Sequence, residues 1–261
     1  MILLILSSTT ACNQRKKRST QTTTEKATTT LTVSAAASLQ NTLQDIQSAY
    51  TKQHPHTTVI YNFGSSGSLM QQISQGAPVD VFLSASTDWM DALSQNGDIV
   101  ETSRRPLLKN ALVLIVSSET TDITSFQDLR ISPSMKIAVG EPNSVPVGRY
   151  TQEVLSDLEL FNVLKPQLVF GKDARQVLAY VETGNAAAGI VYVTDALASK
   201  QVNIIEAAAA DTHSPITYPV AVIQGSQQQE AAQTFVNFLS TQAAQDIFER
   251  DGFEVIPSPI E

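Results

Sequence analysis

A serine at the start of a helix can bind a small anion, and the sequence has two turns where this arrangement is expected. The first turn follows the apolar run at 31–33 and leads to Ser38. The apolar residues after it repeat at helical spacing: Leu39, Leu43, Ile46 and Tyr50. A helix start carries unpaired N–H groups and a partial positive charge, so an anion binds there without lysine or arginine. We predict that Ser38 caps this helix and donates its proton to a ligand; the alternative is a cap alone.

The second turn is the segment 64–68, which is rich in glycine and serine and follows a strand-like run at 56–63. The helix predicted after this turn ends at Gly76. Ser66 therefore has the same relation to its helix as Ser38, although serine is also a common turn residue without any ligand.

The composition limits the classes of partner. The chain of 261 residues is 42% hydrophobic, so it can bury a substantial core in one large or two modest domains. Its net charge of -8 and isoelectric point of about 4.9 argue against nucleic acid, because phosphate binding needs a basic surface. A single cysteine leaves no intramolecular disulfide or multi-cysteine metal site, and His54 and His56 beside Pro55 are typical of a solvated loop. We predict no cofactor and no metal held as a free cation.

The first thirty residues differ in composition from the rest. Residues 1–12 contain a short apolar run, small residues and Cys12, which is typical of a secretion signal that ends at a lipid-modified cysteine. The apolar run is far too short to cross a bilayer as a helix. Residues 13–30 are rich in threonine, lysine, arginine and glutamine, which cannot bury enough apolar surface to fold. We predict a lipid anchor at Cys12 and a disordered tether; the alternatives are a signal cleaved without lipid attachment and an uncleaved tail.

Strand-like and helix-like segments alternate after the tether. Short apolar runs typical of buried strands occur at 79–83, 111–116, 136–140, 167–170, 187–193 and 219–223. Helical spacing follows most of them, and one helix begins after Asp173, its predicted cap. The alternation predicts an α/β fold in which a parallel sheet has helices on both faces and ligands bind at the carboxyl ends of the strands.

Five short stretches resemble, in sequence and in order, the periplasmic molybdate-binding proteins. They are AAASL at 35–39, FGSS at 63–66, GAPVD at 76–80, VPVGRY at 145–150 and GIVY at 189–192. The resemblance covers nearly everything from 31 to 255. It implies the two-lobed periplasmic-binding-protein type II fold, with a mostly parallel sheet flanked by helices in each lobe and the ligand in the interlobe cleft. Lobe 1 would hold 31–110 and 218–261, and lobe 2 would hold 111–217.

The resemblance also implies a ligand site. Five positions match the family's contacts to the anion: Ser38, Ser66, Val147, Ala174 and Tyr192. The serines would offer hydroxyl and N–H groups, the next two residues main-chain N–H groups, and Tyr192 its phenol. Without the resemblance, Tyr192 would be interpreted as a core aromatic residue. Arg149 is interpreted as a solvated helix residue, because this family holds its dianion with neutral donors.

The function implied is binding of molybdate, and of tungstate with it, outside the cytoplasm, either in the periplasm or tethered to the membrane by lipid. The protein would be a monomer and no enzyme, and it would deliver the anion to an ABC transporter permease in the inner membrane. Three alternatives stay open. The same architecture could select sulfate, thiosulfate or another tetrahedral oxyanion. A secreted serine hydrolase could be built on 64–68, although the second glycine of the nucleophile elbow is missing. A tethered adhesion or scaffold module would need an exposed apolar patch.

Overall fold

The computed structural model describes residues 28–118, 122–131 and 134–257. The predicted signal segment 1–12 with Cys12, and the part of the predicted tether up to residue 27, lie outside the described residues. Strand β1 begins at Thr29, so residues 29 and 30 belong to a sheet and not to the predicted tether 13–30. None of the helices in these described ranges is long and apolar enough to cross a bilayer.

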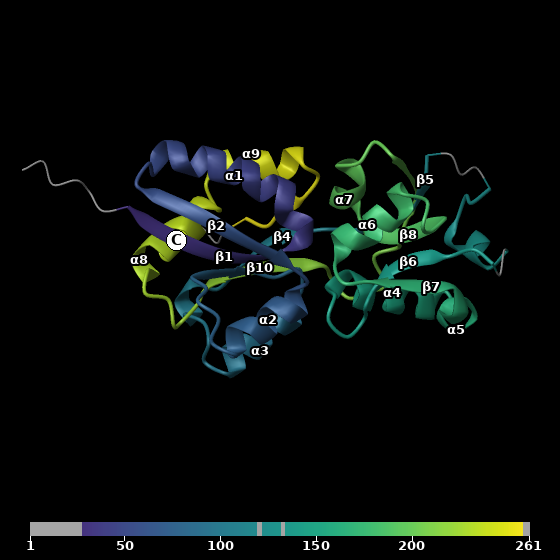
Figure 1. Cartoon of the computed structure of the whole chain (residues 1–261), viewed down its shortest axis with the longest axis horizontal. Coiled ribbons are helices and arrows are strands. Elements are labelled where there is room, and N and C mark those ends of the chain that lie inside the picture. The colour runs from purple at the N-terminus through teal and green to yellow at the C-terminus, as the bar shows by residue number, and fades with distance from the viewer. Residues whose placement is uncertain (1–27, 119–121, 132–133, 258–261) are drawn as a thin grey trace, which may run out of the picture.

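The described chain forms two sheets with helices on both faces, and we call the sheet that contains β1 lobe 1 (Figure 1). Its strands lie in the order β11-β4-β10-β3-β1-β2. Their bounds are β1 Thr29–Ala36, β2 Thr57–Gly64, β3 Val81–Leu83, β4 Arg105–Lys109, β10 Thr217–Val222 and β11 Glu254–Val255. β1 is parallel to both β2 and β3, because helices connect these three strands. The other pairings in this sheet are antiparallel.

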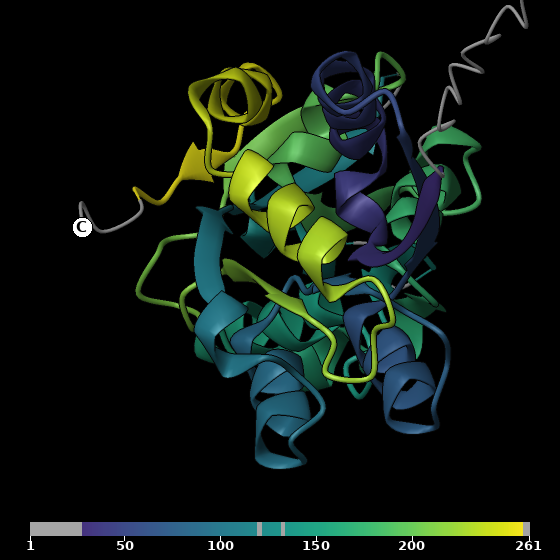
Figure 2. The same ribbon diagram turned by 90° about the vertical axis from the view of Figure 1, so that its left-hand side faces the viewer.

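The helices of lobe 1 cover its sheet in two groups (Figure 2). One face carries α1 (Gln40–Gln53), α8 (Gln229–Phe238) and α9 (Gln242–Arg250), and the other carries α2 (Ser66–Ser74) and α3 (Thr87–Gln95). The predicted stripe of α1 is buried, and Tyr50 at its end packs edge-on against Phe235 and Phe238 of α8, with ring centroids 5.1 Å apart in each pair. Helical spacing in the sequence therefore marked the core-facing side of α1.

Lobe 2 is built around the second sheet, whose strands lie in the order β7-β6-β8-β5-β9. Their bounds are β5 Leu112–Ser117, β6 Ile137–Gly140, β7 Leu168–Gly171, β8 Ala188–Tyr192 and β9 Val202–Ala207. One face packs against α4 (Pro146–Asp157) and α5 (Phe161–Leu164), and the other against α6 (Ala174–Glu182) and α7 (Val193–Leu197). β6 is parallel to β7 and β8, whereas β5 is antiparallel to β8 and β9.

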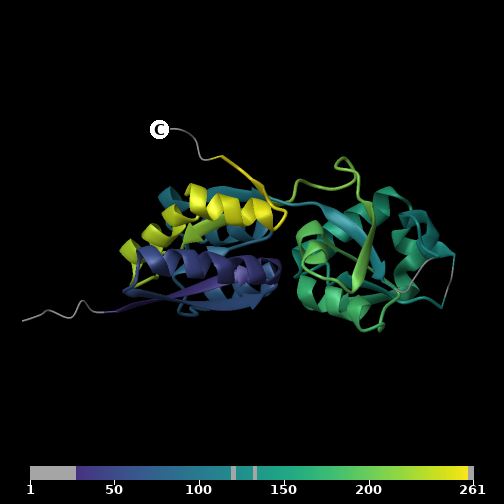
Figure 3. The same ribbon diagram turned by 90° about the horizontal axis from the view of Figure 1, so that it is seen from above.

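Two crossing segments connect the lobes (Figure 3). The first runs from β4 through Asn110 into β5, and the second runs from β9 through 208–216 into β10. β5 and β10 each enter their sheet from the cleft, so they run away from the cleft. The parallel strands of both sheets run toward the cleft, so β10 is antiparallel to β3 and β5 is antiparallel to β8. The fold is thus the predicted two-lobed α/β arrangement with mixed sheets. We keep the predicted domain ranges, 31–110 with 218–261 and 111–217, as a proposal.

Candidate functional site

One cavity between the lobes is lined by all five residues that the sequence predicts as contacts. Lobe 1 contributes the turns after β1 and β2, and lobe 2 contributes the starts of α4 and α6 and the end of β8. The cavity holds about 200 Å³ of empty space, counting the solvent at its mouth. Within the described ranges its lining is uncharged: Ala36, Ala37, Ser38, Gly64, Ser65, Ser66, Ala85, Val145, Pro146, Val147, Ala174 and Tyr192.

Ser38 lines the cavity but does not cap α1, so the predicted capping role is wrong. A 3-10 turn, Ala37–Leu39, stands between β1 and α1, and the residue before the first turn of α1 is Leu39. The hydroxyl of Ser38 instead lies 3.0 Å from the hydroxyl of Tyr218. The spacing of apolar residues could not reveal the extra turn, because the 3-10 residues are buried like the helical stripe that follows.

Ser66 is the first residue of α2, and its neighbour Ser65 is the cap. The Ser65 hydroxyl oxygen accepts a 3.3 Å hydrogen bond from the Ser68 N–H. The Ser66 Oγ accepts a 2.9 Å hydrogen bond from the N–H of Ala85, which follows β3. A main-chain N–H can only donate, so the proton of the Ser66 hydroxyl is left for another acceptor. Ser66 is fully buried at the wall of the cavity and is oriented there as a donor.

Main-chain donors come from lobe 2 at Val147 and Ala174. Val147 is the second residue of α4, and Ala174 is the first residue of α6. N–H groups in the first turn of a helix have no carbonyl partner within that helix, so they can serve a ligand. Asp173 caps α6 as predicted, because its carboxylate accepts a 2.8 Å hydrogen bond from the Gln176 N–H.

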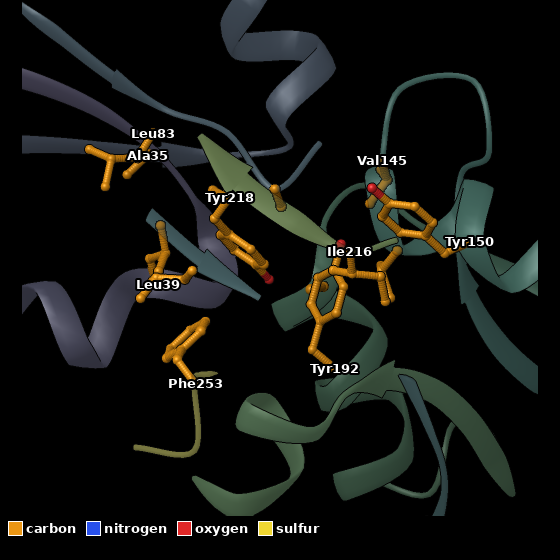
Figure 4. Packing of buried hydrophobic residues seen from close by; sticks show 14 of the residues in the cluster. Ala35, Leu39, Leu83, Val145, Tyr150, Tyr192, Ile216, Tyr218 and Phe253 are labelled. Carbon is orange, nitrogen blue, oxygen red and sulfur yellow. The ribbon is translucent and has the colours of Figure 1, made fainter. Parts of the chain in front are cut away.

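Three phenols point into the space between the lobes (Figure 4). Tyr192 ends β8, Tyr150 lies on α4, and Tyr218 lies on β10. The hydroxyl groups of Tyr150 and Tyr192 are buried and have no hydrogen-bond partner in the described part of the chain. Burial raises the pKa of both phenols, so each keeps a proton that it can donate. An unpaired buried hydroxyl costs free energy, and an acceptor in the cavity would relieve that cost at Tyr192.

Arg149 bridges the lobes at the rim of the site, and the sequence-based interpretation of a solvated residue is wrong. Its Nη1 lies 3.3 Å from Asp88 Oδ2 of lobe 1 and 3.0 Å from Glu153 Oε1 of its own helix. Its Nη2 donates to Ser86 Oγ at 3.2 Å, and the guanidinium carbon stands 4.5 Å from the ring centroid of Tyr150. Arg149 thus joins the lobes without lining the cavity.

A second interlobe link contains a buried carboxyl group. Asp195, in α7, is fully buried, and its Oδ1 lies 3.4 Å from the Nε of Arg175. The same Nε donates to the carbonyl oxygen of Ala37 in lobe 1 at 3.4 Å. Burial raises the pKa of Asp195 to about 7, and the positive charge of Arg175 opposes this rise.

A larger cavity of about 640 Å³, with its open solvent included, shares Ser38 with the first but differs in chemistry. Its charged lining residues are already paired. Arg250 Nη2 lies 2.5 Å from Asp45 Oδ2 and 2.9 Å from Asp251 Oδ1, and Arg175 pairs with the buried Asp195. In the described chain, histidine, cysteine and carboxylate side chains form no group of three that could hold a metal ion. The uncharged cavity is therefore the better candidate for the anion.

Two residues beside the site, Asn110 and Tyr218, were not singled out from the sequence. The Asn110 side chain donates to the Tyr218 hydroxyl at 3.3 Å, and Tyr218 in turn lies against Ser38. Both stand where the chain was predicted to pass from one lobe to the other, and that position is the signal that could have identified them.

Comparison with known proteins assigns nearly all of the described chain to one family. Residues 31–254 match the model of the bacterial extracellular solute-binding proteins. A candidate ABC transporter substrate-binding lipoprotein of Bacillus subtilis, YvgL, is 48% identical over 223 residues, which is 85% of this chain and 85% of YvgL. The molybdate-binding protein ModA of Haemophilus influenzae is 38% identical over 226 residues, covering 85% of this chain and 89% of ModA.

Among solved structures, the substrate-binding domain of a candidate molybdenum ABC transporter from Clostridium difficile is 42% identical to this chain. The two superpose with a TM-score of 0.68, over 88% of this chain and all of that domain. The likeness thus includes sequence and fold together, over both lobes.

Proposed function

The chain belongs to the bacterial extracellular solute-binding proteins, in the family of the molybdate-binding proteins, and on this premise we propose that it binds molybdate and tungstate as the substrate-binding component of an ABC importer. The observation that supports this ligand class most strongly is the uncharged, donor-rich lining of the interlobe cavity within the described chain. We assign the ligand contacts to Ser38, Ser66, Val147, Ala174 and Tyr192.

The chemistry of the lining fits a fully deprotonated oxyanion. Such an anion has only hydrogen-bond acceptors, while hydroxyl, phenol and N–H groups can all donate. Each bond to a charged acceptor contributes about 1.5 to 3 kcal/mol, so a few of them provide strong binding without a cationic side chain. A protonated phosphate would need an acceptor in return, and one of the two acceptor sites on Ser66 Oγ is already taken by the Ala85 N–H.

Selection between dianions must use size, because sulfate has the same charge and shape as molybdate with shorter bonds. A rigid arrangement of donors from two lobes can make this distinction, since a smaller anion cannot reach all of them at once. Closure follows from the same geometry, because the donors of both lobes meet the anion only when the lobes are together.

The family is one of binding proteins, so the chain is not an enzyme and the serine hydrolase alternative fails. We propose that the protein works outside the cytoplasm as a monomer and passes its anion to a membrane permease. Attachment to the membrane through lipid on Cys12 is part of the same proposal, and Cys12 lies outside the described residues.

A thermal-shift screen over molybdate, tungstate, sulfate, thiosulfate and phosphate tests the ligand class. A ligand at 1,000 times its Kd stabilises the folded protein by about 4 kcal/mol through mass action. We expect molybdate and tungstate to raise Tm most, and we expect calorimetric titration with sulfate as competitor to leave molybdate bound.

The outcomes separate the remaining alternatives. If sulfate or thiosulfate raised Tm more than molybdate, the proposed ligand would be wrong while the proposed site would stand. If none of the five anions shifts Tm, the assignment of the cavity as an oxyanion site is wrong, and the adhesion or scaffold alternative gains weight.

A further inference from the structure

A chain of polar groups on the two crossing segments stands behind Ser38. Asn110 follows β4 on the first crossing segment, and Tyr218 lies on β10 at the end of the second. The Asn110 Nδ2 donates to the Tyr218 hydroxyl at 3.3 Å, and this hydroxyl lies 3.0 Å from the Ser38 Oγ. Figure 4 shows the phenol of Tyr218 directed into the space between the lobes, toward Tyr192.

The direction of the first hydrogen bond is fixed by the main chain. The Ala111 N–H donates to the Asn110 Oδ1 at 2.9 Å, and a main-chain N–H cannot accept. The other end of the amide is therefore the Nδ2 group, which can only donate. It donates both to Tyr218 and, at 2.9 Å, to Thr194 Oγ1 of lobe 2.

The direction of the second hydrogen bond follows from the first. The Tyr218 hydroxyl accepts from Asn110, so its own single proton must go to another acceptor. Burial raises the pKa of Tyr218, which keeps that proton in place. Ser38 Oγ, 3.0 Å from the Tyr218 hydroxyl, is the acceptor that we assign to this proton. Because Ser38 Oγ accepts from Tyr218, its own proton is left free for the cavity.

We propose that Tyr218 is a positioning residue that, together with Asn110, turns Ser38 into an obligatory hydrogen-bond donor toward the anion. This inference rests on the proposed function, because it concerns the polarity of the same oxyanion site. If the Ser38 proton turned toward Tyr218 instead, the anion would meet a lone pair and be repelled. The network removes that arrangement before the ligand arrives, which spares binding the cost of reorienting the hydroxyl.

Ser66 provides an internal comparison for this role. Its oxygen is occupied by the Ala85 N–H, a partner that can only donate, so the polarity of Ser66 needs no further support. Ser38 faces a phenol, which can donate or accept, and only Asn110 decides between the two directions. The two serines reach the same orientation, one through a single main-chain group and the other through a relay on the crossing segments.

A double-mutant cycle between Tyr218→Phe and Ser38→Ala, read as the calorimetric Kd for molybdate, tests the inference. Wild-type binding of molybdate is measured first, and its absence would contradict the proposed function itself. Tyr218→Phe as a single substitution should weaken binding about threefold to tenfold, which corresponds to the free energy of one neutral hydrogen bond. In the Ser38→Ala background it should change the affinity less than about twofold, because Tyr218 acts through Ser38. Equal losses in both backgrounds overturn the positioning role while the function stands.

Tyr61→Phe is the matched control. Tyr61 also lies in lobe 1 and donates to a main-chain carbonyl, that of Leu43, at 3.0 Å, but it does not line the cavity. Its replacement should leave the Kd unchanged, and a loss equal to that of Tyr218→Phe would show a general effect of removing a phenol hydroxyl.

Asn110→Asp gives a second test, in which the relay is reversed. Two acceptor oxygens at this position would draw the Tyr218 proton toward residue 110, and Ser38 would then donate to Tyr218. As a single substitution, Asn110→Asp should lower the affinity more than tenfold. In the Ser38→Ala background the factor should be clearly smaller, because only the added negative charge then weakens anion binding. The same factor in both backgrounds overturns the relay. Thermal unfolding without ligand checks that each variant folds; if Asn110→Asp does not fold, the Tyr218→Phe cycle decides.

Discussion

In the proposed site, lobe 1 offers the hydroxyl groups of Ser38 and Ser66, whereas lobe 2 offers main-chain N–H groups at Val147 and Ala174 together with the phenol of Tyr192. Both halves offer donors and neither offers a full charge. The difference is that a side-chain donor disappears with one substitution, while a main-chain donor disappears only if the backbone moves. Ligand affinity should therefore depend on the residue type at Ser38 and Ser66. At Val147 and Ala174 it should depend on the contacts that fix the position of the main chain.

The largest effects are expected from the serines of lobe 1. Ser38→Ala or Ser66→Ala should weaken molybdate binding about tenfold to a hundredfold, since each removes one hydrogen bond to a charged acceptor. Calorimetry measures this, with Ser48→Ala as the control, because Ser48 is an exposed residue of α1 far from the cavity lining. Unchanged affinity in both variants would show that the serine hydroxyl groups of lobe 1 are not ligand contacts.

Stability distinguishes the two serine variants from each other. Ser66→Ala leaves the buried main-chain N–H of Ala85 without its partner, and this group cannot turn. Ser38→Ala removes the acceptor of the Tyr218 proton, but this hydroxyl can rotate and keeps the bond that it accepts from Asn110. An unsatisfied buried group costs about 1 to 3 kcal/mol, and each kcal/mol lowers Tm by about 2–4 °C in a protein of this size. Without ligand, Ser66→Ala should therefore melt at a lower temperature than Ser38→Ala.

Gly148→Ala tests whether binding depends on the position of the main chain in lobe 2. We expect a smaller loss of affinity than for the two serine variants. A Cβ on Gly148 would overlap the main-chain carbonyl of Gly140, where β6 passes under the start of α4. Gly148→Ala should lower stability by about 1 to 3 kcal/mol and shift the Val147 N–H, with an affinity loss of up to about tenfold. Gly225→Ala is the control, because a Cβ there meets nothing within 4 Å.

The contact between the lobes gives a third, still smaller effect. Asp88→Asn removes the ion pair with Arg149 across the cleft, which forms only when the lobes are together. This pair is only partly buried, and such pairs are weak, so we expect the molybdate affinity to fall about twofold to fivefold because the closed state is less stable. Asp91→Asn, on the same helix, breaks a pair with Arg104 inside lobe 1 and should leave the affinity unchanged. Equal effects of the two variants would contradict an interlobe role for Arg149.

The elements that carry the site could be predicted because their signals are local. The apolar runs at 79–83 and 111–116 gave strands, and the glycine and serine content of 64–68 gave the turn into α2. β4, β9 and β11 were not identified, since β4 contains Pro106, β9 is largely exposed, and β11 has two residues. Strands at or near a sheet edge lack the continuous apolar run that marks a buried strand.

The partners of the site residues could not be predicted, because they are distant in sequence. Ser38 and Tyr218 are 180 residues apart, and the Arg149 pair with Asp88 joins different lobes. The capping role predicted for Ser38 failed because a 3-10 turn stands between β1 and α1, and its residues are buried like the helical stripe that follows. Local patterns determine the element on which a side chain lies, while tertiary contacts determine which of its donor and acceptor atoms already have hydrogen-bond partners.

The smallest effect on binding is expected at Val147, and it is the sharpest test of the difference between the lobes. Its side chain is fully buried, so Val147→Ala should leave a small void and cost about 1 to 3 kcal/mol of stability. Its N–H remains at the second position of α4, so the Kd for molybdate should change less than about twofold. Ser38→Ala should differ by its large loss of affinity. If Val147→Ala weakened binding as much as Ser38→Ala, the contact at Val147 would depend on its side chain and not only on its N–H.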